Sequence, residues 1–230
     1  MIQKIIPVII PCRNELSNLK VLIKLFTDLS DRFNPILVDN GSSDGSGKFA
    51  EKKGWEVVYE PRVGYGNACK QGIKYVISKY PQTEFISFFD ADVSEHPQDL
   101  EILLEFMKRY KLDLILGSRK EYFHRMPSKV RIANIFFARL ISILYRYPLK
   151  DNGPMRIIKS DVLKELNMTD NYYGWTFEMT IKALKMDKKV GEIPIRHFNR
   201  LSGNSKISGD FFNSLLSLFQ IMTILIRYIR

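Results

Sequence analysis

The chain has 230 residues, 45% of them hydrophobic, which is enough to bury the core of one sizeable domain. Its 35 Lys and Arg residues outnumber 25 Asp and Glu, and the net charge of +10 predicts an anionic partner: nucleic acid, an anionic membrane surface or phosphorylated substrates. Two cysteines, Cys12 and Cys69, with no CxxC pattern and no Cys/His cluster, argue against a disulfide framework and a zinc site. A reducing cytoplasm is the expected compartment.

The first apolar run, residues 5–10, predicts a β-strand rather than a signal peptide. It is short for the apolar region of a signal peptide, is interrupted by Pro7 and runs directly into the polar residues 13–15. Further along, no window reaches about 18 uninterrupted apolar residues, so we expect no membrane-spanning helix.

Strand and helix patterns alternate through the first half of the chain. Strands are predicted at 5–10, 35–39, 56–59, 85–89 and 113–117, with helices at 16–29, 45–53, 66–79 and 97–110. This alternation indicates βαβ units, and therefore an α/β fold with a mostly parallel central sheet flanked by helices. A long apolar and basic helical stretch at 127–147, a Gly-bearing turn at 151–154, a mixed portion and a final helix at about 211–230 follow. No internal repeat or linker marks a second independent domain.

Two carboxylates, Asp90 and Asp92, come directly after the apolar run 85–89. A run of this kind is typical of a buried strand, and ligands bind at the carboxyl ends of strands in open α/β sheets. Hard oxygen donors at that position suit Mg²⁺ or Mn²⁺ bridging the phosphates of a nucleotide. The alternative is a helix start, because residues 92–95 ahead of Pro97 also resemble capping chemistry.

Three other strands are also followed by polar loops, PCRNE, DNGSSDG and GSR, and the last two of these loops carry glycine. These loops are residues 11–15, 39–45 and 117–119. Acids and glycines concentrated at one edge of a parallel sheet indicate a nucleotide site. Taken alone, residues 39–45 could be a turn in which Ser43 or Asp44 caps a helix. Residues 64–67, GYGN, are a weak phosphate-loop signal, because they lack a third glycine and could simply begin a helix.

These motifs resemble the signature series of family-2 glycosyltransferases with the GT-A fold: IPCRNE at 10–15, VDNGSSDG at 38–45 and DAD at 90–92. Later motifs at 117–119, 151–156, 173–179 and 202–209 resemble the polyprenyl-phosphate branch, which includes dolichyl-phosphate mannose and glucose synthases. The resemblance covers nearly the whole chain, in order. It implies a GT-A domain over residues 1–210 and a C-terminal amphipathic helix at a membrane interface over 211–230.

The resemblance also implies roles for individual residues. The implied nucleotide-sugar site comprises Pro11, Asn14, Glu15, Asp39, Asn40, Gly41, Gly64, Lys70, Asp90, Ala91 and Asp92, with Asp90 and Asp92 holding the metal. The implied acceptor and phosphate site comprises Arg119, Trp175, Glu178, Arg200 and Lys206, and the charge of an acceptor phosphate adds Arg131 as a further positioning arginine. Asp92, Asp151 and Arg119 form the implied catalytic set. Many relatives carry two aspartates where this chain has Asp39 and Asn40, which bears on donor specificity.

The expected activity is that of an inverting hexosyltransferase. The resemblance implies transfer from a UDP- or GDP-sugar to a polyprenyl (dolichyl-type) phosphate, with Mg²⁺ or Mn²⁺; the alternative is a soluble or cell-envelope glycan acceptor. A phosphate acceptor is already an anion and needs no strong general base, which agrees with the absence of His from the signature loops. A nucleic-acid-binding module is disfavoured, because the basic residues are dispersed rather than interleaved with aromatics.

Two helical stretches carry apolar residues at helical spacing together with basic ones. Residues 132–147 are flanked or interrupted by Lys129, Arg131, Arg139 and Arg146, and residues 211–230 end with Arg227 and Arg230. Both patterns fit amphipathic helices in a bilayer interface near anionic headgroups. The alternative is core packing with a solvated basic face. The expected location is the cytoplasm, with peripheral attachment to the cytoplasmic face of the membrane.

Overall fold

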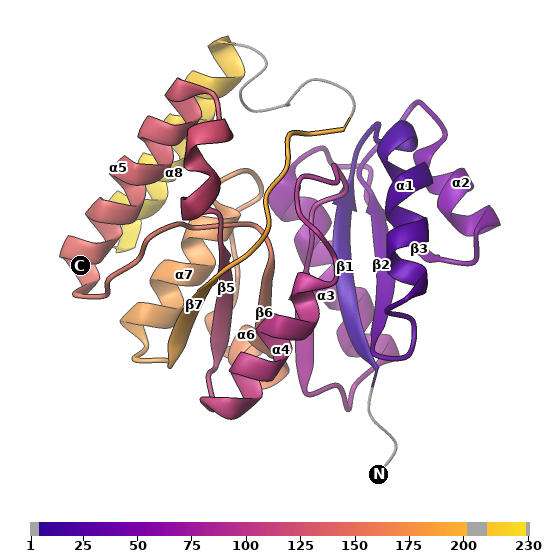
Figure 1. Cartoon of the computed structure of the whole chain (residues 1–230), viewed down its shortest axis with the longest axis horizontal. Helices are drawn as coiled ribbons and strands as arrows, with labels where there is room; N and C mark the ends of the chain where they lie inside the picture. The colour runs from indigo at the N-terminus through magenta and orange to yellow at the C-terminus, as the bar shows by residue number, and fades with distance from the viewer. Residues whose placement is uncertain (1–4, 202–210, 229–230) are drawn as a thin grey trace.

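The structure, a computed structural model, describes residues 5–201 and 211–228, with side chains of the second segment described from Phe219 onward. Seven strands form one sheet in the order β3-β2-β1-β4-β6-β5-β7 (Figure 1). The strands are β1 (Ile6–Cys12), β2 (Phe33–Asp39), β3 (Glu56–Tyr59), β4 (Phe85–Phe88), β5 (Leu114–Ser118), β6 (Arg156–Lys159) and β7 (Val190–Pro194). The predicted α/β fold with a mostly parallel sheet is confirmed.

Helices cover both faces of this sheet. They are α1 (Leu16–Thr27), α2 (Ser46–Lys52), α3 (Tyr65–Lys79), α4 (Asp99–Arg109), the 3₁₀ helix η1 (Lys120–Arg125), α5 (Ser128–Tyr145), α6 (Ser160–Leu166), α7 (Trp175–Lys185) and α8 (Phe211–Tyr228). Alternate strand residues supply the two cores: Ile9 packs with α3 and α7 on one face, whereas Val8 and Ile10 pack with α1 and α4 on the other. This alternation follows from the two-residue period of a strand.

Strand β6 is the one antiparallel member of the sheet among the described strands. It lies between β4 and β5, with Arg156 paired to both Phe88 and Leu116. Because β6 runs in the opposite direction, the segment that precedes it reaches the same edge at which β4 and β5 end. Residues 151–155 therefore lie beside the loops that follow β4 and β5.

A close approach of two backbones fixes this segment against β5. A Cβ added at Gly153 would lie 2.2 Å from the carbonyl oxygen of Gly117. No side-chain adjustment could relieve a contact with backbone, so only glycine fits at position 153. The Gly-bearing turn predicted at 151–154 is thus a packing requirement at the edge of the sheet.

Helices α5 and α8 lie at one end of the molecule, away from α1 and α2 (Figure 1). Both pack on α7, and the Tyr145 hydroxyl donates a hydrogen bond of 2.8 Å to the carbonyl oxygen of Tyr228. Among the described residues, no helix combines the length and the hydropathy that crossing a bilayer requires. The division into residues 1–210 and 211–230 stays a prediction.

Candidate active site

A cavity of about 430 Å³ opens where β1, β2 and β4 end. Eight of the residues predicted for the donor and phosphates line it: Pro11, Glu15, Asn40, Gly64, Asp90, Ala91, Asp92 and Arg200. The remaining lining residues are Cys12, Arg13, Val63, Tyr65, Ala68, Tyr172 and Tyr173. The loops after β1, β2 and β4 therefore meet around one cavity, whereas the predicted loop 117–119 contributes no residue to its lining.

The loops after β1 and β2 are fastened to each other. The side-chain oxygen of Asn14 accepts a hydrogen bond of 2.7 Å from the backbone N–H of Ser43. Asp39 accepts hydrogen bonds from the backbone N–H groups of Ser42 (2.8 Å) and Gly47 (3.1 Å). Asn14, Asp39 and the predicted Gly41 lie just outside the cavity lining, and their contacts shape the loop that borders it.

The side chain of Asn40 uses both ends of its amide. Its Nδ2 donates to the carbonyl oxygens of Glu60 (2.9 Å) and Arg62 (2.8 Å), and its Oδ1 accepts from the backbone N–H of Gly64 (2.7 Å). An aspartate cannot donate to two carbonyls. The departure from the paired aspartates of many relatives therefore has a structural reason here: the amide holds residues 60–64 in place.

Asp90 and Asp92 both line the cavity. Asp90 Oδ1 accepts a hydrogen bond of 2.9 Å from the Tyr65 hydroxyl, and Asp92 Oδ1 accepts one of 3.0 Å from the backbone N–H of Ser94. Burial, and then the neighbouring charge of Asp92, raise the pKa of Asp90 to about 7. The helix-start alternative does not hold for Asp92, because α4 begins only at Asp99.

This acid pair fits a hard divalent cation in its chemistry. Two carboxylates that repel each other at a partly buried position are stabilised by an adjacent positive charge. The described residues contain no group of three or more His, Cys, Asp or Glu side chains arranged to hold a metal ion. Asp90 and Asp92 would hold a cation with their carboxylate oxygens, and the rest of the coordination would come from the ligand's phosphates and water, as is usual for Mg²⁺.

The segment that follows β7, residues 195–200, is called the strap here, and it brings Arg200 to the cavity. Arg196 anchors the strap, since its guanidinium and backbone N–H both bond to the Asp99 carboxylate, the latter at 2.8 Å. Arg200 then contacts the Glu15 carboxylate and lies 3.6 Å from Asp92 Oδ2. The Arg200 guanidinium thus places a positive charge beside Asp92.

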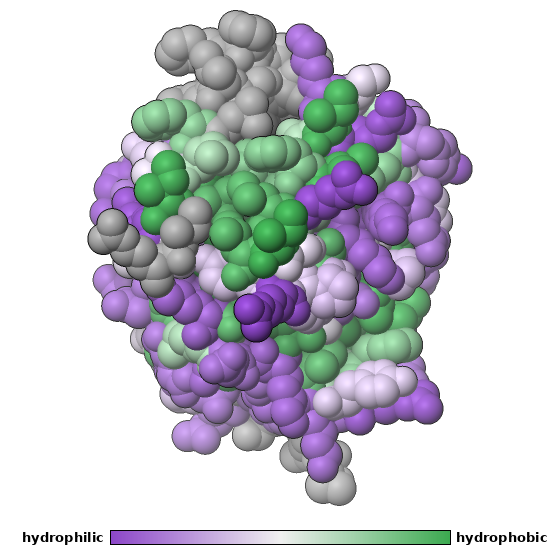
Figure 2. Space-filling view, turned by 90° about the vertical axis from the view of Figure 1, so that its left-hand side faces the viewer, coloured by the Kyte–Doolittle hydropathy of each residue, from purple (hydrophilic) through white to green (hydrophobic). Residues whose placement is uncertain are grey.

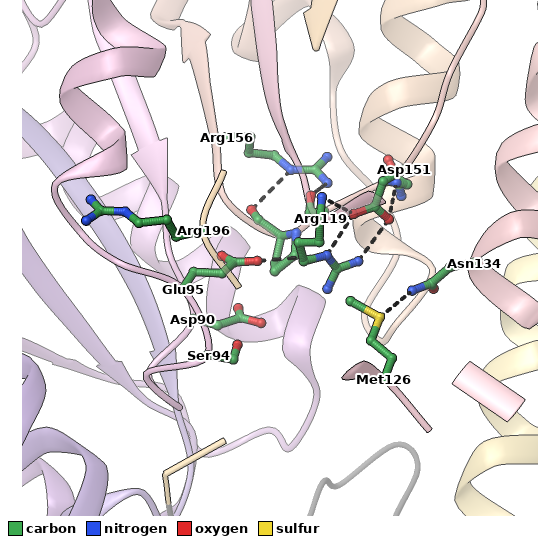
Figure 3. Close-up of polar contacts among 12 residues, drawn as sticks. Asp90, Ser94, Glu95, Arg119, Met126, Asn134, Asp151, Arg156 and Arg196 are labelled. Atoms are coloured by element: carbon green, nitrogen blue, oxygen red, sulfur yellow. Dashed lines mark hydrogen bonds and ion pairs between the residues drawn. The ribbon is translucent and has the colours of Figure 1, made fainter. Parts of the chain in front are cut away.

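Arg119 and Asp151 form a two-pronged ion pair next to the cavity (Figure 3). Arg119 Nε and Nη2 donate to the two Asp151 oxygens at 2.8 and 3.0 Å, and the Arg119 backbone N–H donates at 2.9 Å. Burial would raise the pKa of Asp151, but the charge and hydrogen bonds of Arg119 hold it below the usual value. Glu192 on β7 holds the backbone before this pair in place, because its carboxylate accepts hydrogen bonds from the backbone N–H groups of Lys150 and Asp151.

Glu95 and Arg156 complete a charged cluster to which the sequence alone assigned no role (Figure 3). Neither Glu95 oxygen has a hydrogen-bond partner among the described residues, and Arg119 Nε lies 4.0 Å away. Burial raises the pKa of Glu95 well above its ordinary value, and Arg119 offsets only part of this effect. The available signal for Glu95 was its place three residues after Asp92.

Arg156 is fully buried and bonds to backbone carbonyls, including that of Thr176 at 2.9 Å. Burial lowers its pKa to about 10, so it remains charged at neutral pH. Its charge stabilises both Asp90 and Glu95. Its place in the motif at 151–156 could have indicated a role.

Several other predicted site residues make structural contacts. Trp175 is fully buried and packs against Phe88, with ring centroids 4.8 Å apart. Glu178 accepts from Thr169, from the Asp170 N–H and from the Tyr228 hydroxyl, which ties α7 to α8.

Three further residues lie away from the cavity lining or outside the described residues. Lys70 donates to the Thr169 carbonyl at 3.0 Å, Arg131 lies on α5, and Lys206 is outside the residues that the structure describes. The ligand-binding roles of all these residues stay predictions.

The chain is similar to known proteins in sequence and in fold. The sequence profile of the family described as "Glycosyl transferase family 2" matches residues 8–166. An uncharacterized glycosyltransferase of Mycobacterium tuberculosis is 27% identical over 93% of this chain and 94% of its own length. An undecaprenyl-phosphate mannosyltransferase of Micrococcus luteus is 26% identical over 87% of this chain and 86% of its own length.

Solved structures show the same fold. Glucosyl-3-phosphoglycerate synthase from Mycobacterium tuberculosis, in complex with Mn²⁺, UDP and phosphoglyceric acid, superposes with a TM-score of 0.77 at 16% identity, covering 98% of this chain and 78% of that one. The complex of the same synthase with Mg²⁺ and UDP gives a TM-score of 0.77, at 16% identity and with 98% and 79% coverage. The chain belongs to glycosyl transferase family 2, has the GT-A fold and is a glycosyltransferase.

Replacing Asn40 with aspartate should destabilise the protein. The variant would place a carboxylate against two buried carbonyl oxygens, at a cost of about 2 kcal/mol or more, which corresponds to a melting temperature lower by about 4–8 °C. Asn199→Asp, at an exposed position, adds the same charge and serves as the control. Equal melting temperatures for the two variants would contradict the role given to the amide.

Replacing Glu95 with glutamine should stabilise the protein more at high pH than at low pH. Because the folded-state pKa of Glu95 is raised, the folded state binds more protons than the unfolded state as pH rises above the unfolded value, so wild-type stability falls there. Glutamine has no such penalty. We expect its melting-temperature advantage to grow by about 2 °C or more between pH 5 and pH 8.

The control for this variant is Glu105→Gln, which removes a charge from an exposed position on α4. Its difference from wild type should stay constant over the same pH range. A Glu95→Gln variant that melts below wild type at every pH would show that the carboxylate stabilises the fold.

Proposed function

We propose that this glycosyltransferase transfers a hexose with inversion from a UDP- or GDP-sugar to a polyprenyl phosphate at the cytoplasmic face of a membrane. Three observations support the proposal: the acid pair in the lining of the cavity, the Arg119–Asp151 pair beside it, and the apolar face that α5 and α8 add next to it. The apolar face of α5 and α8 is the observation that favours a lipid acceptor. The undecaprenyl-phosphate mannosyltransferase relative agrees with that choice.

In this proposal the nucleotide-sugar donor binds in the cavity. The diphosphate would lie against Asp90 and Asp92 through Mg²⁺ or Mn²⁺, which supplies neutralisation of the charge that develops on the leaving group. Arg200, at 3.6 Å from Asp92, would exchange its contact with this acid for one with the phosphates. Buried Arg156 helps to keep Asp90 ionised for this purpose.

In this proposal Arg119 binds the phosphate of the acceptor. Its described hydrogen bonds to Asp151 use Nε and Nη2, so Nη1 is the nitrogen that would bind an acceptor phosphate oxygen. Asp151, held ionised by this arginine, fixes the guanidinium in orientation. A phosphate acceptor is already a nucleophile at neutral pH, so positioning replaces general-base catalysis in this scheme.

An apolar face beside the site supports a lipid acceptor. The exposed hydrophobic side chains of the two helices are Ile132, Ile135, Phe136, Ile143 and Leu144 on α5 and Phe219, Met222 and Ile226 on α8. Figure 2 shows hydrophobic side chains gathered on this side of the molecule. Neither helix contains Asp or Glu, whereas Lys129, Arg139 and Arg227 are exposed on them. Apolar and cationic groups without acids match an anionic bilayer surface.

This face is connected to the cavity. Gln220 on α8 accepts a hydrogen bond of 3.4 Å from the backbone N–H of Tyr173, which lines the cavity. A Cβ at Gly174 would lie 2.7 Å from Ile224, so α8 packs directly on the loop that carries Tyr172 and Tyr173. A lipid held at the α5–α8 face could therefore extend its phosphate towards Arg119 and the acid pair.

Transfer to the two kinds of acceptor tests the proposal. Radiolabelled UDP- and GDP-hexoses are offered with undecaprenyl phosphate in detergent or with 3-phosphoglycerate, and label is counted in the lipid and aqueous phases. We expect lipid-linked label, reduced about 100-fold or more in Asp92→Ala. Label transferred to phosphoglycerate alone would favour the alternative, a family member with a soluble acceptor such as the phosphoglyceric acid bound in the synthase complex.

Vesicle binding tests the α5–α8 face separately. Wild-type protein should sediment with anionic vesicles, less so at high salt. Ile143→Asp should weaken binding about 10-fold, because it replaces a 75% exposed apolar side chain with an acid on that face. The matched control is Ile102→Asp, at a 45% exposed position on α4 across the sheet. If both variants lost binding equally, or if the wild-type protein did not bind vesicles, the proposal that the α5–α8 face binds a membrane would be wrong.

A further inference from the structure

Tyr65, in the first turn of α3, contacts Asp90. Its hydroxyl donates to Asp90 Oδ1 at 2.9 Å, and its ring meets the buried ring of Trp175 at an angle of 64°, with centroids 6.3 Å apart. Trp175 in turn packs against Phe88, the last residue of β4. The phenol is therefore held in place by the same strand that presents Asp90.

The glycines on either side of Tyr65 fix its backbone. A Cβ at Gly64 would lie 2.3 Å from the Asn171 carbonyl oxygen, and one at Gly66 would lie 2.3 Å from the Asp170 carbonyl oxygen. Gly64, at φ +148°, also donates its N–H to Asn40. The GYG sequence thus lets the start of α3 approach residues 170–171 closely, and this approach determines where the tyrosine hydroxyl lies.

We propose that Tyr65 is a positioning residue that orients the Asp90 carboxylate for a divalent cation. The inference rests on the proposed function, since it requires that Asp90 and Asp92 hold the metal. With Oδ1 engaged by the phenol, rotation of the carboxylate is restricted, and Oδ2 together with the remaining lone pair of Oδ1 can bind the cation. Such partners of a metal ligand typically change metal affinity by 10–100-fold when they are removed.

The chain offers a matched control on the same helix. Tyr75 also lies on α3, and its hydroxyl also donates to a carboxylate, Glu56 Oε2, at 2.8 Å. Glu56 is on β3 and does not line the cavity. Replacing either tyrosine with phenylalanine removes one hydroxyl and keeps the ring, so any general effect of losing such a bond appears in both variants.

Mn²⁺ binding measures the proposed role directly. Free Mn²⁺ is followed by electron paramagnetic resonance during titration of wild type, Tyr65→Phe and Tyr75→Phe, each with UDP or GDP present. We expect Tyr65→Phe to bind Mn²⁺ about 10-fold more weakly and Tyr75→Phe to match wild type. In the transfer assay, Tyr65→Phe should need more Mn²⁺ for half-maximal rate yet recover kcat at saturating Mn²⁺, which a merely structural defect would not do.

The outcomes separate this inference from the proposed function. Wild-type binding with unchanged affinity in Tyr65→Phe would overturn the role of Tyr65 alone. A loss shared by Tyr75→Phe, or a kcat that saturating Mn²⁺ does not restore, would show a structural effect and also overturn it. If the wild-type protein binds no Mn²⁺, both this inference and the proposed metal binding by Asp90 and Asp92 are wrong. Lipid-linked product in the transfer assay would then still support the proposed acceptor.

Discussion

The antiparallel insertion of β6 between β4 and β5 is the constraint on which the site depends. It brings residues 151–155 back to the edge where the parallel strands end, so that Asp151 can reach Arg119. The same register buries Arg156 between its two neighbouring strands. The contact of Gly153 with the Gly117 carbonyl leaves no room for a side chain. A purely parallel sheet would deliver this segment to the opposite edge.

Among the described residues, the acids at this edge are only partly compensated by positive charge. Arg119 is committed to Asp151, and buried Arg156 bonds to carbonyl oxygens rather than to a carboxylate. Burial raises the pKa values of Asp90 and Glu95, and the nearby arginines offset only part of this effect. Sites that bind phosphates through a cation are expected to carry such an excess of acid, because the cation arrives with the ligand. The unmet charge is thus consistent with the proposed metal-bound diphosphate.

The cavity and the α5–α8 face are joined through one loop, residues 170–174. Tyr172 and Tyr173 line the cavity from this loop, and α8 packs on its other side at Gly174. The start of α3 rests on the same loop through Gly64 and Gly66. A change at the apolar face could therefore be transmitted to Tyr65 and Asp90 through packed backbone. This arrangement connects the proposed membrane surface physically with the proposed donor site.

The sequence by itself determined the alternating strands and helices, the edge at which the polar loops gather, and the family. These follow from local periodicity and from motifs whose residues are close in the chain, such as Asp90 and Asp92. It gave no role in the site to Glu95, Tyr65 or Arg156. The ligand-binding roles that it assigned to Lys70, Trp175 and Glu178 stay predictions, and the structure adds the contacts that these residues make within the protein. Only the tertiary structure decided these contacts, because burial and hydrogen-bond partners arise from segments far apart in sequence, such as Tyr65 with Asp90 and Asn40 with Gly64.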